Sequence, residues 1–345
     1  MAVSRRTFIT GAAAGAAPLV VPELAAAKTA RMAKQPLRPE RVLNLFSRLP
    51  GTIALKIYAP PANGDRGLLI QSNASQRMFV GSSIKTFALC ETLRRYDSPD
   101  ILLKIGENPL HPNRVVYLPL NQSVWNTDSQ SFNPPNLRGR VTVRTALEAM
   151  ICHSDNTATD MIFKHARPNN IRKFIASIGL HSTDVPDSTR SFFGYLLGAK
   201  DYKHYTWKQL IHSSGVFVKP PLNNVTTLAS SADDLISYYS RALHGKFFKH
   251  QATLQVYREI LAMGDIIWLL PVPLGVTAFA KGGSIDTPGF HAVCAPGAML
   301  FDDRWVYFAM IINWPSPLET DPATLAAFAA AGSQALTLVK DALSR

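Results

Sequence analysis

Hydrophobic residues alternate with polar ones near both ends of the chain, a pattern typical of β-strands that are buried on one face. This period predicts strands over residues 52–59 and 68–71, after a short helix over 40–49. Three further strands are predicted near the other end, over residues 276–280, 291–301 and 305–314. Both ends of the chain therefore contribute strands.

Between these strands the hydrophobic period becomes that of a helix. Helical spacing begins at Ser82 and recurs over residues 143–151, 156–165, 169–178, 230–244 and 251–263. A last helix begins at Asp321, a capping residue followed by proline. We therefore expect an α/β lobe formed by residues 41–80 and 275–345, and a helical lobe formed by residues 81–274.

The first 27 residues have the layout of an export signal. Arg5 and Arg6 precede an apolar stretch over residues 9–21, and Ala25-Ala26-Ala27 forms a small-residue cleavage site. The paired arginines resemble a twin-arginine signal. Residues 28–40 are predicted to be a linker, and the protein is predicted to be periplasmic or secreted.

No later segment is predicted to insert stably into a membrane once this signal is removed. Residues 266–280 are apolar but contain Pro271 and Pro273. Prolines of this kind predict a loop that runs into a buried strand.

Composition and charge narrow the classes of partner. Apolar residues make up 47% of the chain, which excludes global disorder. The formal net charge is +12, but no run of Lys or Arg is longer than two residues, so we expect no nucleic-acid partner. Neither the three cysteines (Cys90, Cys152 and Cys294) nor the histidines have metal-ligand spacing. At most one disulfide is possible, and we favour three buried cysteines that act as small hydrophobic residues. We expect no metal, no cofactor and a monomer.

Three short motifs could carry chemistry: Ser82-Ser83-Ile84-Lys85, Ser154-Asp155-Asn156 and Lys281-Gly282-Gly283. A serine hydroxyl becomes a useful nucleophile when a neighbouring base takes its proton. A helix would place Ser82 and Lys85 on one face, and lysine can act as a base when burial and another cation lower its pKa. Lys281, expected on a strand, would be that cation and would attract a substrate carboxylate. The N–H groups of Ser82 and Ser284 would stabilise an oxyanion.

These motifs resemble those of class A β-lactamases and penicillin-binding serine hydrolases. The resemblance extends to residues 66–74, 141–158, 227–229 and 279–284, and it covers most of residues 40–345. It implies the β-lactamase/transpeptidase-like fold of the α/β (α+β) class. In that fold an antiparallel sheet is flanked by helices and joined to an all-helical lobe.

The resemblance also implies roles for individual residues. Ser82 would be the acylated nucleophile, Lys85 the general base or proton shuttle, and Ser154 the relay to the leaving nitrogen. The substrate would be bound by Asn156, Lys281, Gly283 and Ser284. Asp155 would anchor the loop. The expected partner is a β-lactam or a small molecule like the peptidoglycan stem.

Three functions remain open from the sequence. The first is a hydrolase that forms an acyl-enzyme with β-lactam or related amide substrates. The second is a D-alanyl-D-alanine carboxypeptidase or esterase of the penicillin-binding type, and the third is a non-catalytic module that binds cell-envelope material.

The sequence departs from the class A pattern at two places. Gly282 replaces the usual threonine, which removes a hydroxyl that binds the substrate carboxylate. The class A pattern also has a glutamate about 36 residues past the Ser154 position, which activates the deacylating water. Residues 183–193 contain no glutamate, and we expect their two carboxylates, Asp184 and Asp187, to be surface turn residues.

The spacing between the three motifs is longer than in class A enzymes. The second excess falls around residues 202–224, for which we predict an extra loop or hairpin beside the cleft. Trp125 lies in the first extension, where it is either a stacking residue for the substrate or an ordinary, partly buried aromatic.

Overall fold

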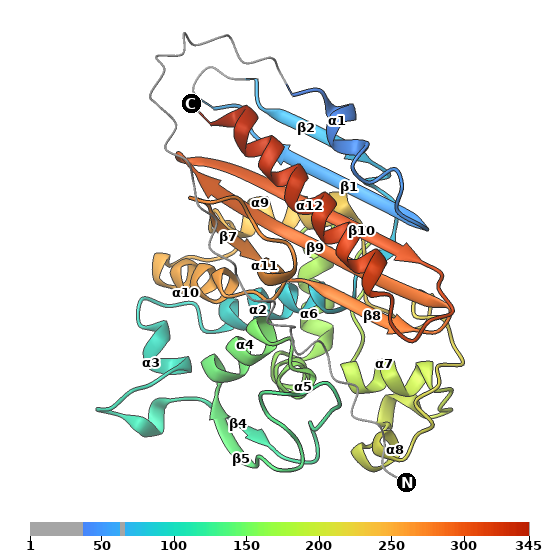
Figure 1. The fold of residues 1–345 in the computed structure, drawn as a ribbon. Helices are drawn as coiled ribbons and strands as arrows, with labels where there is room; N and C mark the ends of the chain where they lie inside the picture. Colours follow the sequence, from blue (N-terminus) through green and yellow to red (C-terminus); the bar gives the residue numbers. More distant parts are fainter. Residues whose placement is uncertain (1–36, 63–65, 345) are drawn as a thin grey trace, which may run out of the picture. The chain divides into compact units, whose positions relative to one another are not determined.

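One antiparallel sheet organises the computed structural model, which describes residues 37–62 and 66–344 (Figure 1). Its strand order is β2-β1-β10-β9-β7, and β8 also pairs with β9. The strands are β1 Thr52–Ala59, β2 Leu68–Ser72, β7 Thr277–Ala280, β8 Gly283–Thr287, β9 Phe290–Phe301 and β10 Arg304–Trp314. The two ends of the chain meet in this sheet where β1 pairs with β10, and the predicted fold class is confirmed.

The hairpin of β9 and β10 forms the centre of the sheet. Its two-residue turn, Asp302-Asp303, has positive φ angles of 48° and 58°, as a type I′ turn requires. In β10, Ala309 and Ile311 pack with the helical part, while Met310 and Ile312 pack with the opposite layer. Both faces are buried, which is why the sequence of this strand is a continuous apolar run.

Two helices, α1 (Pro39–Leu43) and α12 (Pro322–Leu343), cover one face of the sheet (Figure 1). By length and composition α12 could cross a membrane, and it is the one helix in residues 37–62 and 66–344 that could. Its residues Phe328, Leu336 and Val339 pack against the sheet.

The helical part covers the other face of the sheet, beginning with α9 (Ala232–Ala242). At its centre lies α2 (Lys85–Arg95), in which every residue from Lys85 to Leu93 is buried. The other helices are α3 Ile101–Ile105, α4 Val143–Cys152, α5 Asn156–Ala166, α6 Pro168–Ser177, α7 Thr189–Leu196, α8 Trp207–Ile211 and α10 Gln251–Ala262. The short helix α11 (Ile266–Leu269) packs instead in the layer of α1 and α12. Two small sheets, β3 (Met78–Phe79) with β6 (Ala229–Ser230) and β4 (Tyr117–Leu120) with β5 (Gly139–Thr142), complete the helical part.

Local predictions are wrong at two places. Lys281 follows the end of β7 and does not lie on the strand. The loop predicted from residue 266 begins instead with α11. Of the two alternatives predicted for residues 202–224, the structure has the loop and no hairpin, and a capping box between Thr206 and Gln209 starts α8 within it.

The N-terminal predictions fall mainly outside the described residues. The signal peptide and residues 28–36 of the linker are among these, and α1 begins at Pro39. All three cysteines are free; Cys90 and Cys294 are buried and Cys152 is half-buried.

Candidate active site

Ser82 lies in a 3-10 turn, Gly81–Ile84, that leads directly into α2. The serine is half-buried, whereas the residues that follow it, Ser83, Ile84 and Lys85, are buried. The predicted helix start is therefore correct in position, although its first turn is tighter than an α-helix. This arrangement leaves the Ser82 side chain accessible and holds Lys85 in the interior.

Lys85 contacts the second motif. Its Nζ donates to the backbone oxygen of Ser154 at 2.6 Å, to Ser154 Oγ at 3.1 Å and to Asn156 Oδ1 at 2.9 Å. The structure thus brings Lys85 into contact with Ser154 and Asn156, which lie 69 and 71 residues later in the sequence.

The surroundings of Lys85 favour its neutral form. Burial, and next the positive charge of Lys281, lower the pKa of Lys85 to about 7. The carboxylates of Asp265, Asp155 and Asp160 act in the opposite direction. An amine with this pKa is largely deprotonated just above neutral pH, which is what a general base needs.

Ser154 has a left-handed backbone conformation, with φ of 53°. This conformation is uncommon for residues other than glycine and costs about 1–3 kcal/mol. It is held by the next residue, because Asp155 caps α5: its Oδ1 accepts from the Ala158 N–H at 2.8 Å and its Oδ2 from the Phe132 N–H at 3.0 Å. The expectation that Asp155 anchors this loop is confirmed.

The third motif meets the first through backbone atoms. A Cβ on Gly283 would lie 2.5 Å from the Ser82 nitrogen, and a Cβ on Gly81, whose φ is 54°, would lie 2.8 Å from the Ser284 nitrogen. Only glycine permits this close approach. It places the N–H groups of Ser82 and Ser284 on adjoining segments, while the Ser284 side chain is exposed.

Lys281 is fully buried, and its Nζ donates to Asp265 Oδ2 at 2.5 Å and to the backbone oxygen of Gly282 at 2.8 Å. The second carboxylate oxygen of Asp265 accepts from the Gly282 N–H at 3.0 Å. Burial lowers the pKa of Lys281, and Asp265 opposes this effect. Asp265 was missed by the sequence analysis, because no motif or period links it to Lys281.

The two carboxylates of residues 183–193 take part in ion pairs that are largely exposed. Asp184 pairs with Arg77 at 2.7 Å, and Asp187 pairs with Arg172 at 2.7 Å. The position 36 residues past Ser154 is Arg190, whose guanidinium donates to the backbone oxygens of Gln122, Ser123 and Trp125. A guanidinium cannot act as a base at neutral pH.

Trp125 is buried, with 6% of its surface exposed, so it is not a stacking platform for a substrate. Arg138 lies over its ring at 5.3 Å, and Trp207 packs edge-on against it at 6.0 Å. Because Trp207 belongs to residues 202–224, the two extensions of the chain pack against each other.

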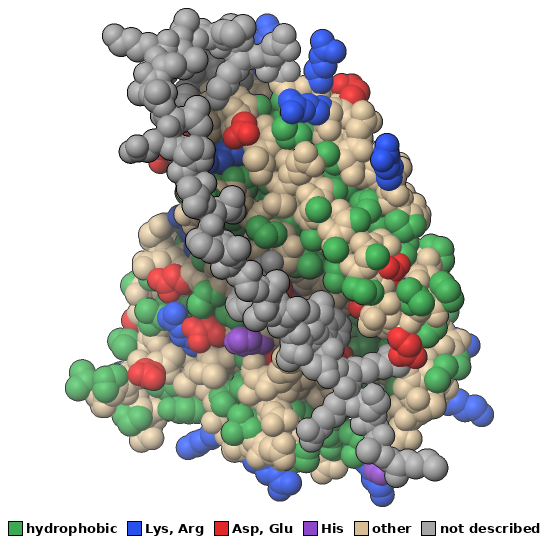
Figure 2. Space-filling view, in the orientation of Figure 1, with side chains coloured by type: hydrophobic (Ala, Val, Ile, Leu, Met, Phe, Trp, Pro, Cys, Tyr) green, Lys and Arg blue, Asp and Glu red, His purple; other side chains and the backbone are tan. Residues whose placement is uncertain are grey.

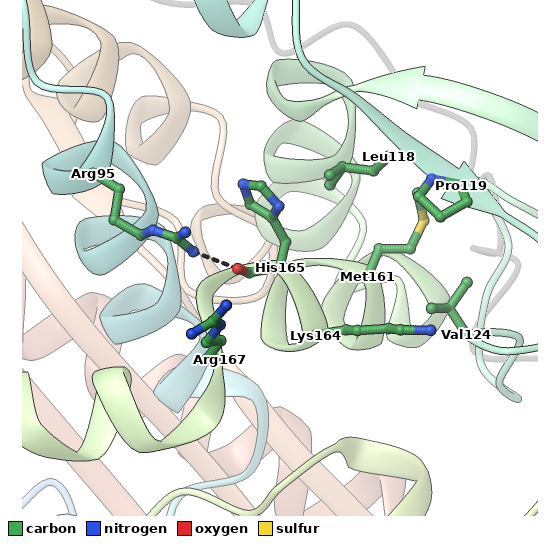
Figure 3. Close-up of a pocket in the computed structure, with 8 residues that line it drawn as sticks. All are labelled: Arg95, Leu118, Pro119, Val124, Met161, Lys164, His165 and Arg167. Carbon is green, nitrogen blue, oxygen red and sulfur yellow. Dashed lines mark hydrogen bonds between the residues drawn. The ribbon is translucent and has the colours of Figure 1, made fainter.

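A cavity of about 350 Å³ lies at the opposite ends of the two helices that carry the site (Figure 3). Its cations, Arg95, Lys164 and Arg167, lie at the C-terminal ends of α2 and α5, and Arg95 donates to the backbone oxygen of His165. Cations at these positions interact favourably with the helix dipoles. The cavity is therefore separate from the serine site, and helix capping explains its charge.

The surface in Figure 2 shows no concentration of basic side chains. Lys and Arg are scattered singly among polar and apolar residues on this face. On the face shown, the positive charge is therefore diffuse.

Comparisons with known proteins identify the family and the fold of this chain. A profile of the beta-lactamase enzyme family matches residues 40–287. A search of curated protein sequences found no match. Solved structures are similar over most of their length. A β-lactamase from Chitinophaga pinensis has a TM-score of 0.63 and 14% identity, covering 88% of this chain and 98% of that one.

Two further structures show the same likeness. A class A β-lactamase representative from Bacteroides cellulosilyticus has a TM-score of 0.64 and 14% identity, covering 88% of this chain and 96% of that one. PBP-A has a TM-score of 0.61 and 17% identity, with the same coverage. At these identities the likeness establishes the fold.

Proposed function

Because this chain belongs to the beta-lactamase enzyme family, we propose that it is a serine hydrolase that forms an acyl-enzyme at Ser82 with β-lactam or related amide substrates. The observation that carries this proposal is the fully buried Lys85, whose pKa is lowered to about 7 and whose amine contacts Ser154 and Asn156. A fully buried amine costs stability, and a role as base accounts for its presence.

The proposed reaction begins with neutral Lys85, which takes the proton of Ser82 Oγ. The oxygen then bonds to the substrate carbonyl carbon, and the carbonyl oxygen takes the negative charge beside the N–H groups of Ser82 and Ser284. When the C–N bond breaks, Ser154 passes the proton from Lys85 to the leaving nitrogen. Asn156 binds the substrate amide, and the close approach at Gly283 keeps the two N–H groups adjacent.

The second step, hydrolysis of the acyl-enzyme by water, is proposed to be slow. Residues 183–193 contain no glutamate, and Asp184 and Asp187 form ion pairs with arginines. Arg190 cannot accept a proton from the deacylating water. A stable acyl-enzyme is the behaviour of a penicillin-binding peptidase or esterase, which makes that activity the second candidate. One solved structure of a mutant PBP-A is an acyl-enzyme complex with penicillin G.

Labelling with a fluorescent penicillin, together with turnover of a chromogenic cephalosporin, tests this proposal. Residues 28–345 and their Ser82→Ala variant would be compared. Stable labelling that needs Ser82, without turnover, is expected; rapid turnover that needs Ser82 would instead identify an efficient lactamase. If neither occurs, the acyl-enzyme proposal is wrong and a binding module becomes the better explanation.

We also propose that residues 1–27 export the chain to the periplasm or beyond through a twin-arginine route. Arg5→Lys with Arg6→Lys should abolish export, measured by cell fractionation of the full chain. Equal export of this double variant would contradict the twin-arginine assignment.

A further inference from the structure

The turn between α10 and α11 packs directly on the segment that carries Lys281. We call residues Gly264–Ile266 the α10–α11 corner. Its three residues contact, in order, the three residues Ala280–Gly282. A Cβ on Gly264 would lie 1.7 Å from the Ala280 backbone oxygen, so the two backbones touch at this point.

The middle residue of the corner neutralises the lysine. Asp265 contacts the Lys281 amine with one carboxylate oxygen and the Gly282 N–H with the other, at 2.5 and 3.0 Å. The Lys281 side chain is fully buried, and that of Asp265 is 29% exposed. A substrate carboxylate that approaches Lys281 would therefore meet a negative charge already bound there.

The last residue of the corner removes a second means of binding a carboxylate. A Cβ on Gly282 would lie 2.6 Å from the Ile266 Cβ. Ile266 thus occupies the space of a side chain at position 282, and a hydroxyl cannot be placed there without moving it. The positive charge of Lys281 and a hydroxyl at position 282 are two means of binding a substrate carboxylate, and both are removed on the same side of the site.

We propose that Asp265 is a specificity-determining residue that selects substrates with a neutral group, an ester or amide, where a carboxylate would otherwise face Lys281. This inference rests on the proposed function. Rejection arises because like charges brought together in a partly buried site repel each other, which is a common source of specificity.

The test compares benzylpenicillin with its methyl ester, in which a methyl group removes the charge of the carboxyl group. The second-order rate constant for acylation of Ser82 is measured for each by mass spectrometry. In the natural protein the ester is expected to react at least as fast as the acid. In Asp265→Asn the acid should gain roughly tenfold, mainly through a lower KM, while the ester changes less than about twofold.

Matched variants separate charge from structure. Asp265→Ser is a second variant without a carboxylate. Asp265→Glu keeps the carboxylate and should prefer the ester as the natural protein does. Asp233→Asn removes a carboxylate from another ion pair, with Lys56 at 2.6 Å, and should leave both rate constants unchanged. Thermal melting confirms that each variant is folded.

Each outcome decides the inference. An unchanged ratio of acid to ester in the neutral variants would overturn it and leave the proposed function standing. If neither neutral variant folds, the natural protein decides, and an acid that reacts about tenfold faster than the ester contradicts the inference. If neither compound acylates Ser82, the proposed function fails and this inference fails with it.

Discussion

Lys85 and Lys281 are fully buried lysines of the same site, and they have different neighbours. The amine of Lys85 donates to two oxygens of Ser154 and one of Asn156, all of them neutral. The amine of Lys281 donates to the carboxylate of Asp265 and to a backbone oxygen. Burial lowers the pKa of both lysines, but only Lys281 has a carboxylate in direct contact to oppose it.

The difference shows how the contacts of two buried amines in one site set their pKa values differently. Burial makes a positive charge costly at both positions, and the carboxylate of Asp265 reduces this cost at Lys281 by direct contact. Lys281 in turn lowers the pKa of Lys85 through its charge. The pKa of the base therefore depends on the charge of the neighbouring lysine, while Asp265 acts in the opposite direction.

Replacement of the base gives the largest expected effect. Lys85→Met should reduce the rate of acylation of Ser82 by about 10²–10⁴, the usual contribution of a general base. Lys281→Met should cause a smaller loss, because the Lys281 amine donates to Asp265 and Gly282 and acts on Lys85 through its charge. Stopped-flow acylation with a fluorescent penicillin measures both variants. Equal losses would show that the two lysines do not have distinct roles.

The pH dependence of acylation should follow Lys85. With a pKa of about 7, the neutral fraction of Lys85, and with it the rate, should rise about 100-fold from pH 5 to pH 8 and then level off. In Lys281→Met the midpoint should move to higher pH, because a neighbouring cation is lost and Asp265 is left unpaired. A midpoint that stays at the same pH would show that Lys281 does not control the base.

The sequence alone predicts the residues that the proposed chemistry requires. It does not predict residues that reach the site only through tertiary packing. Ser82, Lys85, Ser154 and Asn156 occur in local motifs, so their types and order predicted the site. Asp265 reaches Lys281 only because residues 264–266 pack on residues 280–282, and no local period records such a contact.

The same limit applies to residues that were identified with an incomplete role. The loss of a hydroxyl at Gly282 follows from its identity, but the side chain of Ile266 beside it requires the fold. The missing glutamate in residues 183–193 follows from the sequence, whereas the bonds of Arg190 to the loop over residues 122–125 depend on long-range packing.

The last effect expected is on stability, and it compares the two lysines directly. The folded pKa of Lys85 is about 7 and its ordinary value is 10.5, so between these values the unfolded chain binds more protons than the folded one. Linkage then makes the free energy of unfolding rise with pH, by about 1.4 kcal/mol per pH unit relative to Lys85→Met. The same comparison with Lys281→Met should give a shallower slope, because Asp265 opposes the fall in the Lys281 pKa. Urea unfolding at several pH values between about 7 and 10 measures both differences, and a steeper slope for Lys281 would mean that Asp265 does not keep that lysine charged.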